Sequence, residues 1–142
     1  MIIMSVDYGD VRTGISVCDK FEMLASPVCV ITEENEDKLI NKIHELSQQH
    51  HVERFVVGLP KNMDSSEGER AVKCKDFAAK LEETAKIKVV MRDERLTTVS
   101  AHNVLNTTNV RGKKRKAVVD AVAAVMILQE YLDYRRLNPN AD

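Results

Sequence analysis

Three acidic residues stand where carboxylates can do chemistry: Asp7, Glu94 and Asp120. Asp7 ends an apolar run typical of a buried strand, and ligands of open α/β sheets bind at the carboxyl ends of strands. Glu94 follows a second apolar run and reaches the same edge if the two strands are parallel. Asp120 lies in a nearly apolar, helix-like stretch, where a buried carboxylate is costly unless it is paired or bound to a metal.

Each acid also has an ordinary structural explanation. Asp7 suits an Asx-type turn before Gly9, and Asp120 suits a buried ion pair. Glu94 suits a solvated strand end, and its neighbour Asp93 competes with it, since periodicity does not choose between the two. As a set, however, close unpaired carboxylates repel one another unless cations are present. Three converging carboxylates favour Mg²⁺ or Mn²⁺, and two such ions about 4 Å apart are the arrangement used for phosphodiester hydrolysis.

Hydrophobic periodicity predicts the elements that carry these acids. Strands are expected at 2–6, 14–18, 23–31, 55–58 and 89–91, and helices at 35–50, 66–84, 97 or 98 to 106, and 117–134. Pro27 predicts an edge strand or a bulge, and Ser66 with Glu69 predicts a capping box. The polar, basic segment 107–116 is expected to be a mobile loop, and the last helix, apolar nearly all round, to be largely buried.

The order of these elements predicts one α/β domain over residues 1–142. Its sheet is mixed and five-stranded, a three-stranded antiparallel meander plus two parallel strands, with helices on both faces.

The amino-acid composition excludes some classes of protein and favours others. Apolar residues make up 44% of the 142 residues, which is enough for a core, whereas aromatic residues make up 4% and Trp is absent. This scarcity argues against a module that stacks bases on several rings. The net charge of −1 means that nucleic-acid contact must come from a local patch. Three widely spaced cysteines suggest reduced thiols, and no stretch suits a membrane span, so a soluble cytoplasmic protein is expected.

One such basic patch precedes the helix that carries Asp120. It places five cations in six positions, namely Arg111, Lys113, Lys114, Arg115 and Lys116. Phosphate contact is favoured over an incidental solvated loop, because the charge elsewhere is balanced. Further candidate substrate contacts are Arg12, Lys61, Asn62 and Arg95. Arg12 is equally suited to a structural ion pair. Lys61 and Asn62 also suit a plain polar loop, and Arg95 also suits the role of orienting Glu94.

Four stretches in order resemble one known family over essentially the whole chain: DYGDVRTG at 7–14, GLPKNMD at 58–64, DERLTT at 93–98 and DAVAA at 120–124. This is the YqgF family of RuvX-type Holliday junction resolvases, within the RNase H-like superfamily. The resemblance implies an RNase H-like fold and makes Asp7, Glu94 and Asp120 the catalytic, metal-binding acids. Lys61 and Ser65-Ser66 depart from the usual pattern without touching the acids.

The resemblance also implies a bacterial cytoplasmic nuclease that processes the 5′ end of precursor 16S ribosomal RNA, while an older assignment to branched DNA remains attached to the family. A divalent-metal-dependent endonuclease acting on this RNA is therefore the first hypothesis, and a resolvase of four-way DNA junctions is the second. An actin-like ATPase is disfavoured because one lobe does not enclose a nucleotide. A catalytically silent assembly factor that only binds RNA is disfavoured because it has no use for clustered acids. A monomer or weak homodimer is expected.

Overall fold

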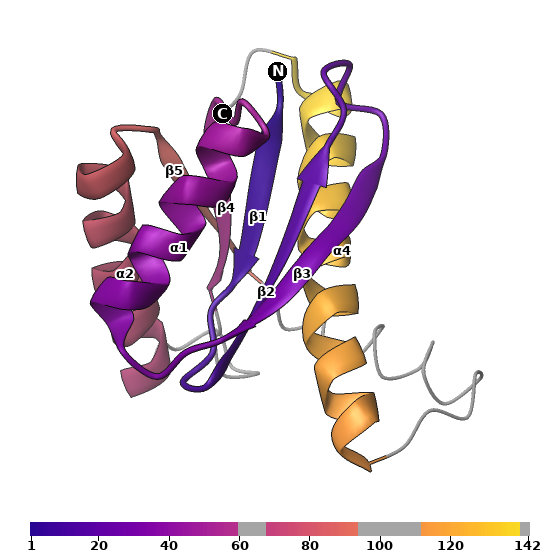
Figure 1. Ribbon diagram of the computed structural model, residues 1–142. Coiled ribbons are helices and arrows are strands. Elements are labelled where there is room, and N and C mark those ends of the chain that lie inside the picture. Colours follow the sequence, from indigo (N-terminus) through magenta and orange to yellow (C-terminus); the bar gives the residue numbers. More distant parts are fainter. Residues whose placement is uncertain (60–67, 94–111, 140–142) are drawn as a thin grey trace.

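The structure, a computed structural model, describes residues 1–59, 68–93 and 112–139, with the side chains of residue 93 and residues 112–121 excepted. Its five-stranded sheet has the order β3-β2-β1-β4-β5 (Figure 1). The strands are β1 (Ile3–Asp7), β2 (Arg12–Cys18), β3 (Ala25–Thr32), β4 (Arg54–Leu59) and β5 (Val89–Asp93). β2 is antiparallel to both β1 and β3, whereas β4 is parallel to both β1 and β5. The predicted mixed sheet is confirmed.

Strand β3 is one edge of the sheet, as Pro27 predicted, and it is also irregular. Ile15 of β2 pairs with Cys29 whereas Ser16 pairs with Pro27, so the register shifts by one residue at this point. A proline has no amide hydrogen for the ladder, which an edge position or a bulge tolerates. β3 begins at Ala25, two residues later than expected, because the preceding residues form a turn.

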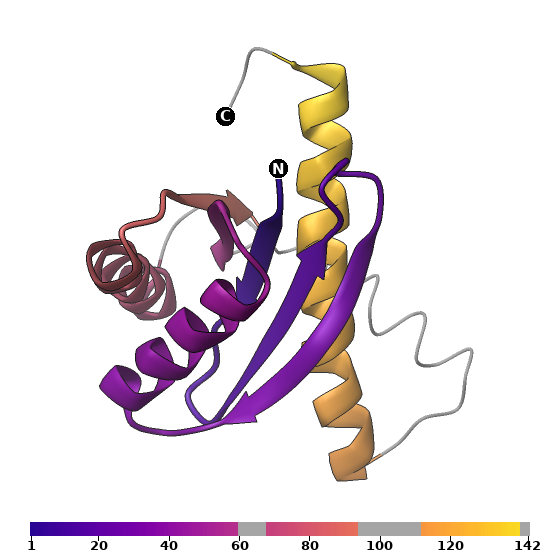
Figure 2. The ribbon, with the colours of Figure 1, turned by 45° about the horizontal axis from the view of Figure 1, so that its top comes forward.

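Helices α1 (Glu36–Gln49) and α2 (Glu69–Ala85) cover one face of the sheet (Figures 1 and 2). The Asn35 side chain caps α1 by accepting from the backbone N–H of Lys38 at 2.9 Å, and two acidic residues in the first turn complement the helix dipole. α1 buries Leu39, Ile40 and Ile43 on this face. Its core partners on α2 are Ala71, Cys74, Phe77, Ala78 and Leu81.

The predicted start of α2 is wrong. The N-cap is Gly68, without a side-chain cap bond, and Glu69 is the first helical residue. A capping box needs its acid at the third helical position, so Glu69 is two positions too early for that role. Ser66, the proposed cap, lies outside the described residues. The far end is close to the prediction, and Lys86 closes the helix in the left-handed conformation with its N–H bonded to Glu82 O at 2.8 Å.

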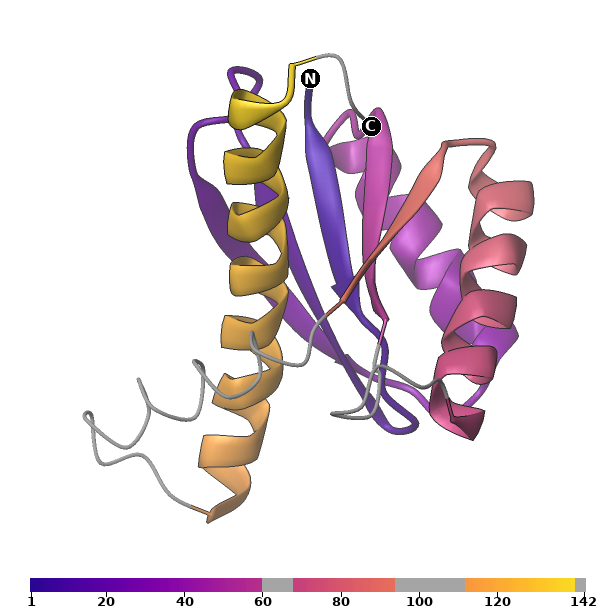
Figure 3. The same ribbon diagram turned by 180° about the vertical axis from the view of Figure 1, so that it is seen from behind.

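Helix α4 (Gly112–Leu137) covers the opposite face (Figure 3). From residue 122 onward it buries one stripe, formed by Ala123, Ala124, Ile127, Leu128, Tyr131 and Leu132. Glu130 and Asp133 are exposed, so the described part of this helix is buried on one side rather than all round. Ile3 and Val56 of the sheet pack against the stripe.

The prediction of a mobile loop over 107–116 is wrong for residues 112–116, which form the first turns of α4. Lys, Arg and Ala have high helix propensity, and clustered charge does not cancel it when the helix is continued by a packed apolar segment. Residues 107–111, and the helix expected from Thr97 or Thr98 to residue 106, lie outside the described residues. No disulfide joins the three cysteines, and within the described chain no helix is long and apolar enough to cross a membrane.

Candidate active site

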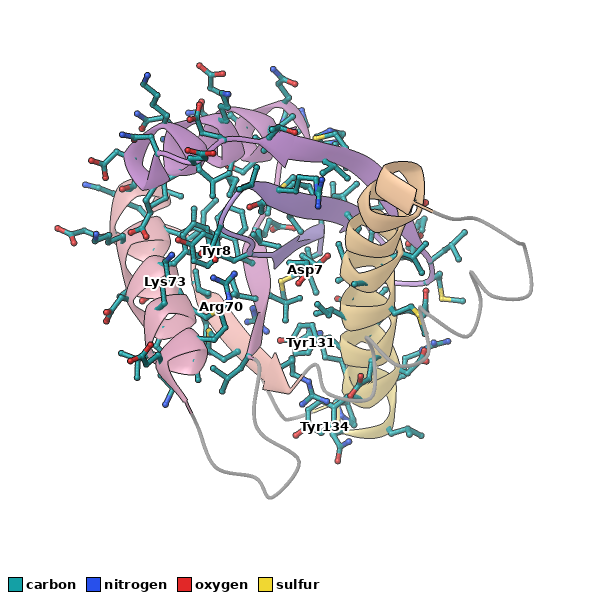
Figure 4. All side chains as sticks on the ribbon, turned by 90° about the horizontal axis from the view of Figure 1, so that it is seen from below. Asp7, Tyr8, Arg70, Lys73, Tyr131 and Tyr134 are labelled. Atoms are coloured by element: carbon teal, nitrogen blue, oxygen red, sulfur yellow. The ribbon has the colours of Figure 1, made fainter. Side chains whose placement is uncertain are left out.

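Asp7 is the last residue of β1, the central strand, and it lies on the face covered by α4. Side chains alternate along a strand. Ile3 packs beneath α4 and Ser5 bonds to its backbone, whereas Met4 and Val6 join the core beneath α1 and α2. Asp7 continues the first set, and Figure 4 shows it between β1 and α4. The predicted position of Asp7, at the carboxyl end of the first strand, is confirmed.

The carboxyl ends of β1, β4 and β5 meet at one edge, because these strands are parallel. Val6 is level with Val57, and the next residue of β4, Gly58, is level with Arg92 of β5. The Arg92 guanidinium lies 4.5 Å from the ring centre of Tyr134 in α4 and 3.5 Å from the Glu130 carboxylate. Arg92 therefore links the end of β5 to α4.

A buried polar contact fixes the position of α4 over β1 and β2. Ser5 and Ser16, both fully buried, face each other across the two strands. Ser5 Oγ donates to the carbonyl oxygen of Ala124 at 2.6 Å, and Ser16 Oγ reaches the same oxygen at 2.9 Å. Burying these hydroxyls is tolerated because both are hydrogen-bonded.

Because this contact joins Ser5 to Ala124, the backbone positions of Asp7 and residue 120 can be compared along the axis of α4. α4 runs opposite to β1 (Figure 1), and residue 120 precedes Ala124 by about one helical turn, roughly 6 Å. Asp7 follows Ser5 by two strand residues, roughly 7 Å in the same direction. The two backbone positions are therefore at about the same level along the helix axis.

The turn after Asp7 brings the backbone of β1 and β2 into close contact. A Cβ atom at Gly9 would lie 2.0 Å from the carbonyl oxygen of Arg12, so this position requires glycine. The Gly9 N–H also donates to Thr13 Oγ1 at 3.3 Å. The turn places Arg12, the first residue of β2, at the same edge as Asp7.

The remaining predicted site residues fall into two groups. Lys113, Lys114, Arg115, Lys116 and Asp120 belong to α4, and only their backbone is described; those that lie outside the described residues are Lys61, Asn62, Glu94, Arg95 and Arg111. Among the side chains that the structure does describe, no group of three His, Cys, Asp or Glu comes together. Asp7, with its two carboxylate oxygens, is the one predicted acid within that set, and its chemistry suits Mg²⁺ or Mn²⁺.

A basic cluster at the start of α2 was missed in the sequence. Arg70 and Lys73 both contact the Asp10 carboxylate, and both lie over the ring of Tyr8, which follows Asp7 (Figure 4). The hydrogen bond from Lys73 and the charge of Arg70 lower the pKa of Asp10. Burial and the hydrogen bond to Glu36 raise the pKa of Tyr8 to about 12. The spacing of three residues, which puts both cations on one helical face, was the available signal.

Comparisons with known proteins agree with this architecture. A model of the family described as "RuvX: Holliday junction resolvase" matches residues 1–134. Relatives named "Putative pre-16S rRNA nuclease" include one from Halothermothrix orenii, 44% identical over 135 residues covering 95% of this chain and 96% of the relative. Another, from Bacillus cytotoxicus, is 40% identical over 135 residues covering 94% and 98%.

Solved structures show the same fold at low sequence identity. RuvC of Thermus thermophilus, in complex with a Holliday junction substrate, superposes with a TM-score of 0.63 at 14% identity and covers 97% of this chain and 96% of that one. The fowlpox virus Holliday junction resolvase gives a TM-score of 0.55 at 14% identity, covering 94% and 99%. With its RNase H-like fold and a family match over residues 1–134, the chain belongs to the RuvX family of Holliday junction resolvases, a family of nucleases.

Proposed function

We propose that this protein is a divalent-metal-dependent endonuclease that processes the 5′ end of precursor 16S ribosomal RNA. The observation that carries the proposal is the position of Asp7 at the carboxyl end of the central strand, on the side that faces α4. The relatives at 34–44% identity, whose name refers to pre-16S rRNA, support the choice of substrate. This substrate puts the activity in the cytoplasm.

Asp7, Glu94 and Asp120 are the proposed catalytic acids. Three facts about the described residues support this set besides the family motifs. The strand β5, which Glu94 follows in sequence, is parallel to β4 and thus to β1. Asp120 is a residue of α4, one turn before the carbonyl that Ser5 and Ser16 contact. Along β5, Val90 packs toward α4 and Arg92 contacts it. Because every second side chain of a strand lies on the same face, Glu94 is the next residue in this series.

The proposed acids have the ligand chemistry of Mg²⁺ or Mn²⁺, with carboxylate oxygens only. A bound divalent ion would supply a Lewis acid for the phosphoryl oxygen and lower the pKa of a bound water. The protein's own part is to hold the acids on a strand and a helix that are rigidly joined. The Ser5–Ala124 contact is one such joint.

Basic residues and one asparagine are the proposed substrate contacts. Lys113, Lys114, Arg115 and Lys116 belong to the first turns of α4, which project past the end of the sheet where β1 ends (Figures 1 and 3). Arg12 begins β2 at that edge. Arg111, Arg95, Lys61 and Asn62 complete the proposed set. Phosphate neutralisation by such residues gives affinity that weakens with salt. A monomer or weak homodimer stays a prediction.

A side-by-side cleavage assay tests the proposal. Precursor 16S RNA and a four-way DNA junction are incubated with the protein in Mg²⁺ or Mn²⁺, with a chelator control. Asp7→Asn is expected to abolish cleavage while nucleic-acid binding stays within about twofold, since only the reacting centre changes. Asp37→Asn, an exposed acid in the first turn of α1, is the matched control and is expected to cut normally.

A thermal shift provides a readout that does not depend on turnover. Mg²⁺ or Mn²⁺ is expected to raise the melting temperature of the wild type and of Asp37→Asn, and to raise that of Asp7→Asn much less, because an ion that binds only the folded state stabilises it. Cleavage by Asp7→Asn would refute the proposed site. Cleavage of the junction alone would move the protein to branched DNA, and RNA binding without any cleavage would favour an assembly factor.

A further inference from the structure

A carboxylate bridges two cations beside the end of β1. Asp10 lies in the turn between β1 and β2, and its Oδ1 atom is 2.7 Å from Arg70 Nη1 and 2.5 Å from Lys73 Nζ. Both cations come from the first turns of α2 and converge on this single oxygen. The side chains are accessible, with exposed fractions of 65% for Asp10, 35% for Arg70 and 49% for Lys73.

Arg70 is held in place by groups other than Asp10. Arg70 Nη2 donates to the backbone carbonyl of Tyr8, and its guanidinium lies 4.9 Å from the centre of the Tyr8 ring. That ring is buried and stacks on Phe77 with a centroid separation of 4.1 Å, and its hydroxyl bonds to Glu36 at 3.0 Å. Arg70 is therefore oriented by a rigid platform that does not depend on the exposed carboxylate.

Stability does not account well for this arrangement. An ion pair this exposed contributes little to folding, because water screens the charges and two long side chains lose freedom. Two oriented cations that share one anionic oxygen are, in contrast, the arrangement that binds a phosphate, where charge-assisted hydrogen bonds are short. The carboxylate oxygen of Asp10 occupies the place that a phosphate oxygen would take.

We propose that Arg70 and Lys73 form a binding site for a backbone phosphate of the nucleic-acid substrate, and that Asp10 fills this site until the substrate displaces it. The inference rests on the proposed function only in taking nucleic acid as the ligand. Tyr8 and Asp7 are consecutive residues whose side chains point to opposite faces of β1. A nucleic-acid strand that contacts both Arg70 and Asp7 therefore crosses the edge of the sheet.

The two halves of this inference predict effects of opposite sign. Asp10→Asn removes the competing anion and is expected to tighten binding about two- to fivefold, the range that corresponds to an exposed ion pair. Arg70→Gln is expected to weaken binding about tenfold, and the Arg70→Gln/Lys73→Gln double variant more. Loss of one phosphate contact also lowers the slope of log affinity against log salt by about 0.7 for single strands and 0.9 for duplexes.

Binding is measured by fluorescence anisotropy in chelator, with a single-stranded RNA oligonucleotide and a four-way DNA junction, over a range of salt concentrations. Asp76→Asn and Lys75→Gln, at exposed positions of the same helix, make the same changes in net charge and are the matched controls. Melting temperatures verify that every variant is folded. Inorganic phosphate and a mononucleotide are run as competitors, and neither is expected to displace the oligonucleotide at equal phosphate concentration.

Several outcomes would overturn the inference. A purely structural pair would make Asp10→Asn and Arg70→Gln change binding in the same direction or not at all. Affinities equal to those of Asp76→Asn and Lys75→Gln would mean that only net charge matters. Full competition by inorganic phosphate would mean a simple anion site. The assay needs no cleavage. If the protein binds nucleic acid through Arg70 but does not cut it, the proposed function alone is refuted. If the protein cuts and the Arg70→Gln/Lys73→Gln variant binds as tightly as the wild type, this inference alone is refuted.

Discussion

At the residue scale, the position of Asp7 depends on its small neighbours Gly9 and Ser5. Gly9 lets the chain reverse within four residues so that Asp7 ends β1 and Arg12 starts β2. The buried Ser5 keeps β1 close to α4 on the side where Asp7 lies. Residues without any catalytic chemistry thus determine where the carboxylate is.

Gly9→Ala is expected to destabilise the protein by about 1–3 kcal/mol, a typical cost of overpacking. The added Cβ would meet the Arg12 carbonyl oxygen at 2.0 Å, and this contact is with backbone, which cannot swing away. The free energy of unfolding in urea measures the effect. Val11→Ala, at an exposed position of the same turn, is the control. A Gly9→Ala stability within about 0.5 kcal/mol of the wild type would contradict the clash.

At the element scale, α4 is attached to the sheet by apolar packing and by a polar contact that has fewer donor protons than close oxygen pairs. Three close contacts join Ser5 Oγ, Ser16 Oγ and the Ala124 carbonyl oxygen. Two hydroxyls supply only two protons for them. Removal of either serine leaves the carbonyl one donor, whereas removal of both leaves it none from the sheet.

Ser5→Ala and Ser16→Ala are each expected to cost about 1 kcal/mol, and the double variant more than their sum. A double-mutant cycle of unfolding free energies measures this coupling. Ser47→Ala is the control, because Ser47 is equally buried but donates within α1, to the carbonyl of His44 at 2.6 Å. It should add to Ser5→Ala without coupling. Simple additivity of Ser5→Ala and Ser16→Ala would show that the shared acceptor is unimportant.

At the scale of the whole molecule, Glu22 joins three distant parts of the chain at the end opposite to Asp7. It lies in the turn between β2 and β3, and its carboxylate accepts from the terminal amino group of Met1 at 3.1 Å and from Arg135 Nε at 2.6 Å. Burial opposes the charge, but the bonds from Arg135 and the terminal amino group prevail and lower the pKa of Glu22 below its ordinary value of 4.5.

Glu22→Gln is expected to lower stability at pH 7 by about 1–3 kcal/mol, because it removes hydrogen bonds to a charged acceptor. A carboxylate with a lowered folded pKa contributes stability that is complete above pH 4.5 and is lost as pH falls through the folded value. The difference in melting temperature between wild type and variant should therefore shrink below about pH 4. Melting curves from pH 3 to 7 test this, with the exposed Glu45→Gln as control. A difference independent of pH would exclude Glu22 as the titrating group.

What the sequence determined by itself is local. The apolar run in 2–6, the alternation in 14–18 and the helical spacing of Leu39, Ile40 and Ile43 each predicted an element, and Pro27 predicted an edge position or a bulge. These predictions were possible because conformational preference and periodicity act over a few residues. The apolar run also predicted the place of Asp7 at a strand end, which the structure confirms. These local signals were weakest at element ends, where the start of α2 and of α4 were misplaced, because helix ends depend on packing as much as on propensity.

Only the tertiary structure decided which groups share a surface. The parallel pairing of β1 with β4, about fifty residues apart, and of β4 with β5 brings three strand ends to one edge. The contact of Asp10 with Arg70 spans sixty residues, and that of Ser5 with Ala124 spans 119. No local pattern encodes such contacts, because they follow from strand order and from the face on which each helix packs. The physical reason is that periodicity determines which residues share one face of a helix or strand. Burial between elements that are distant in sequence determines which other element packs against that face.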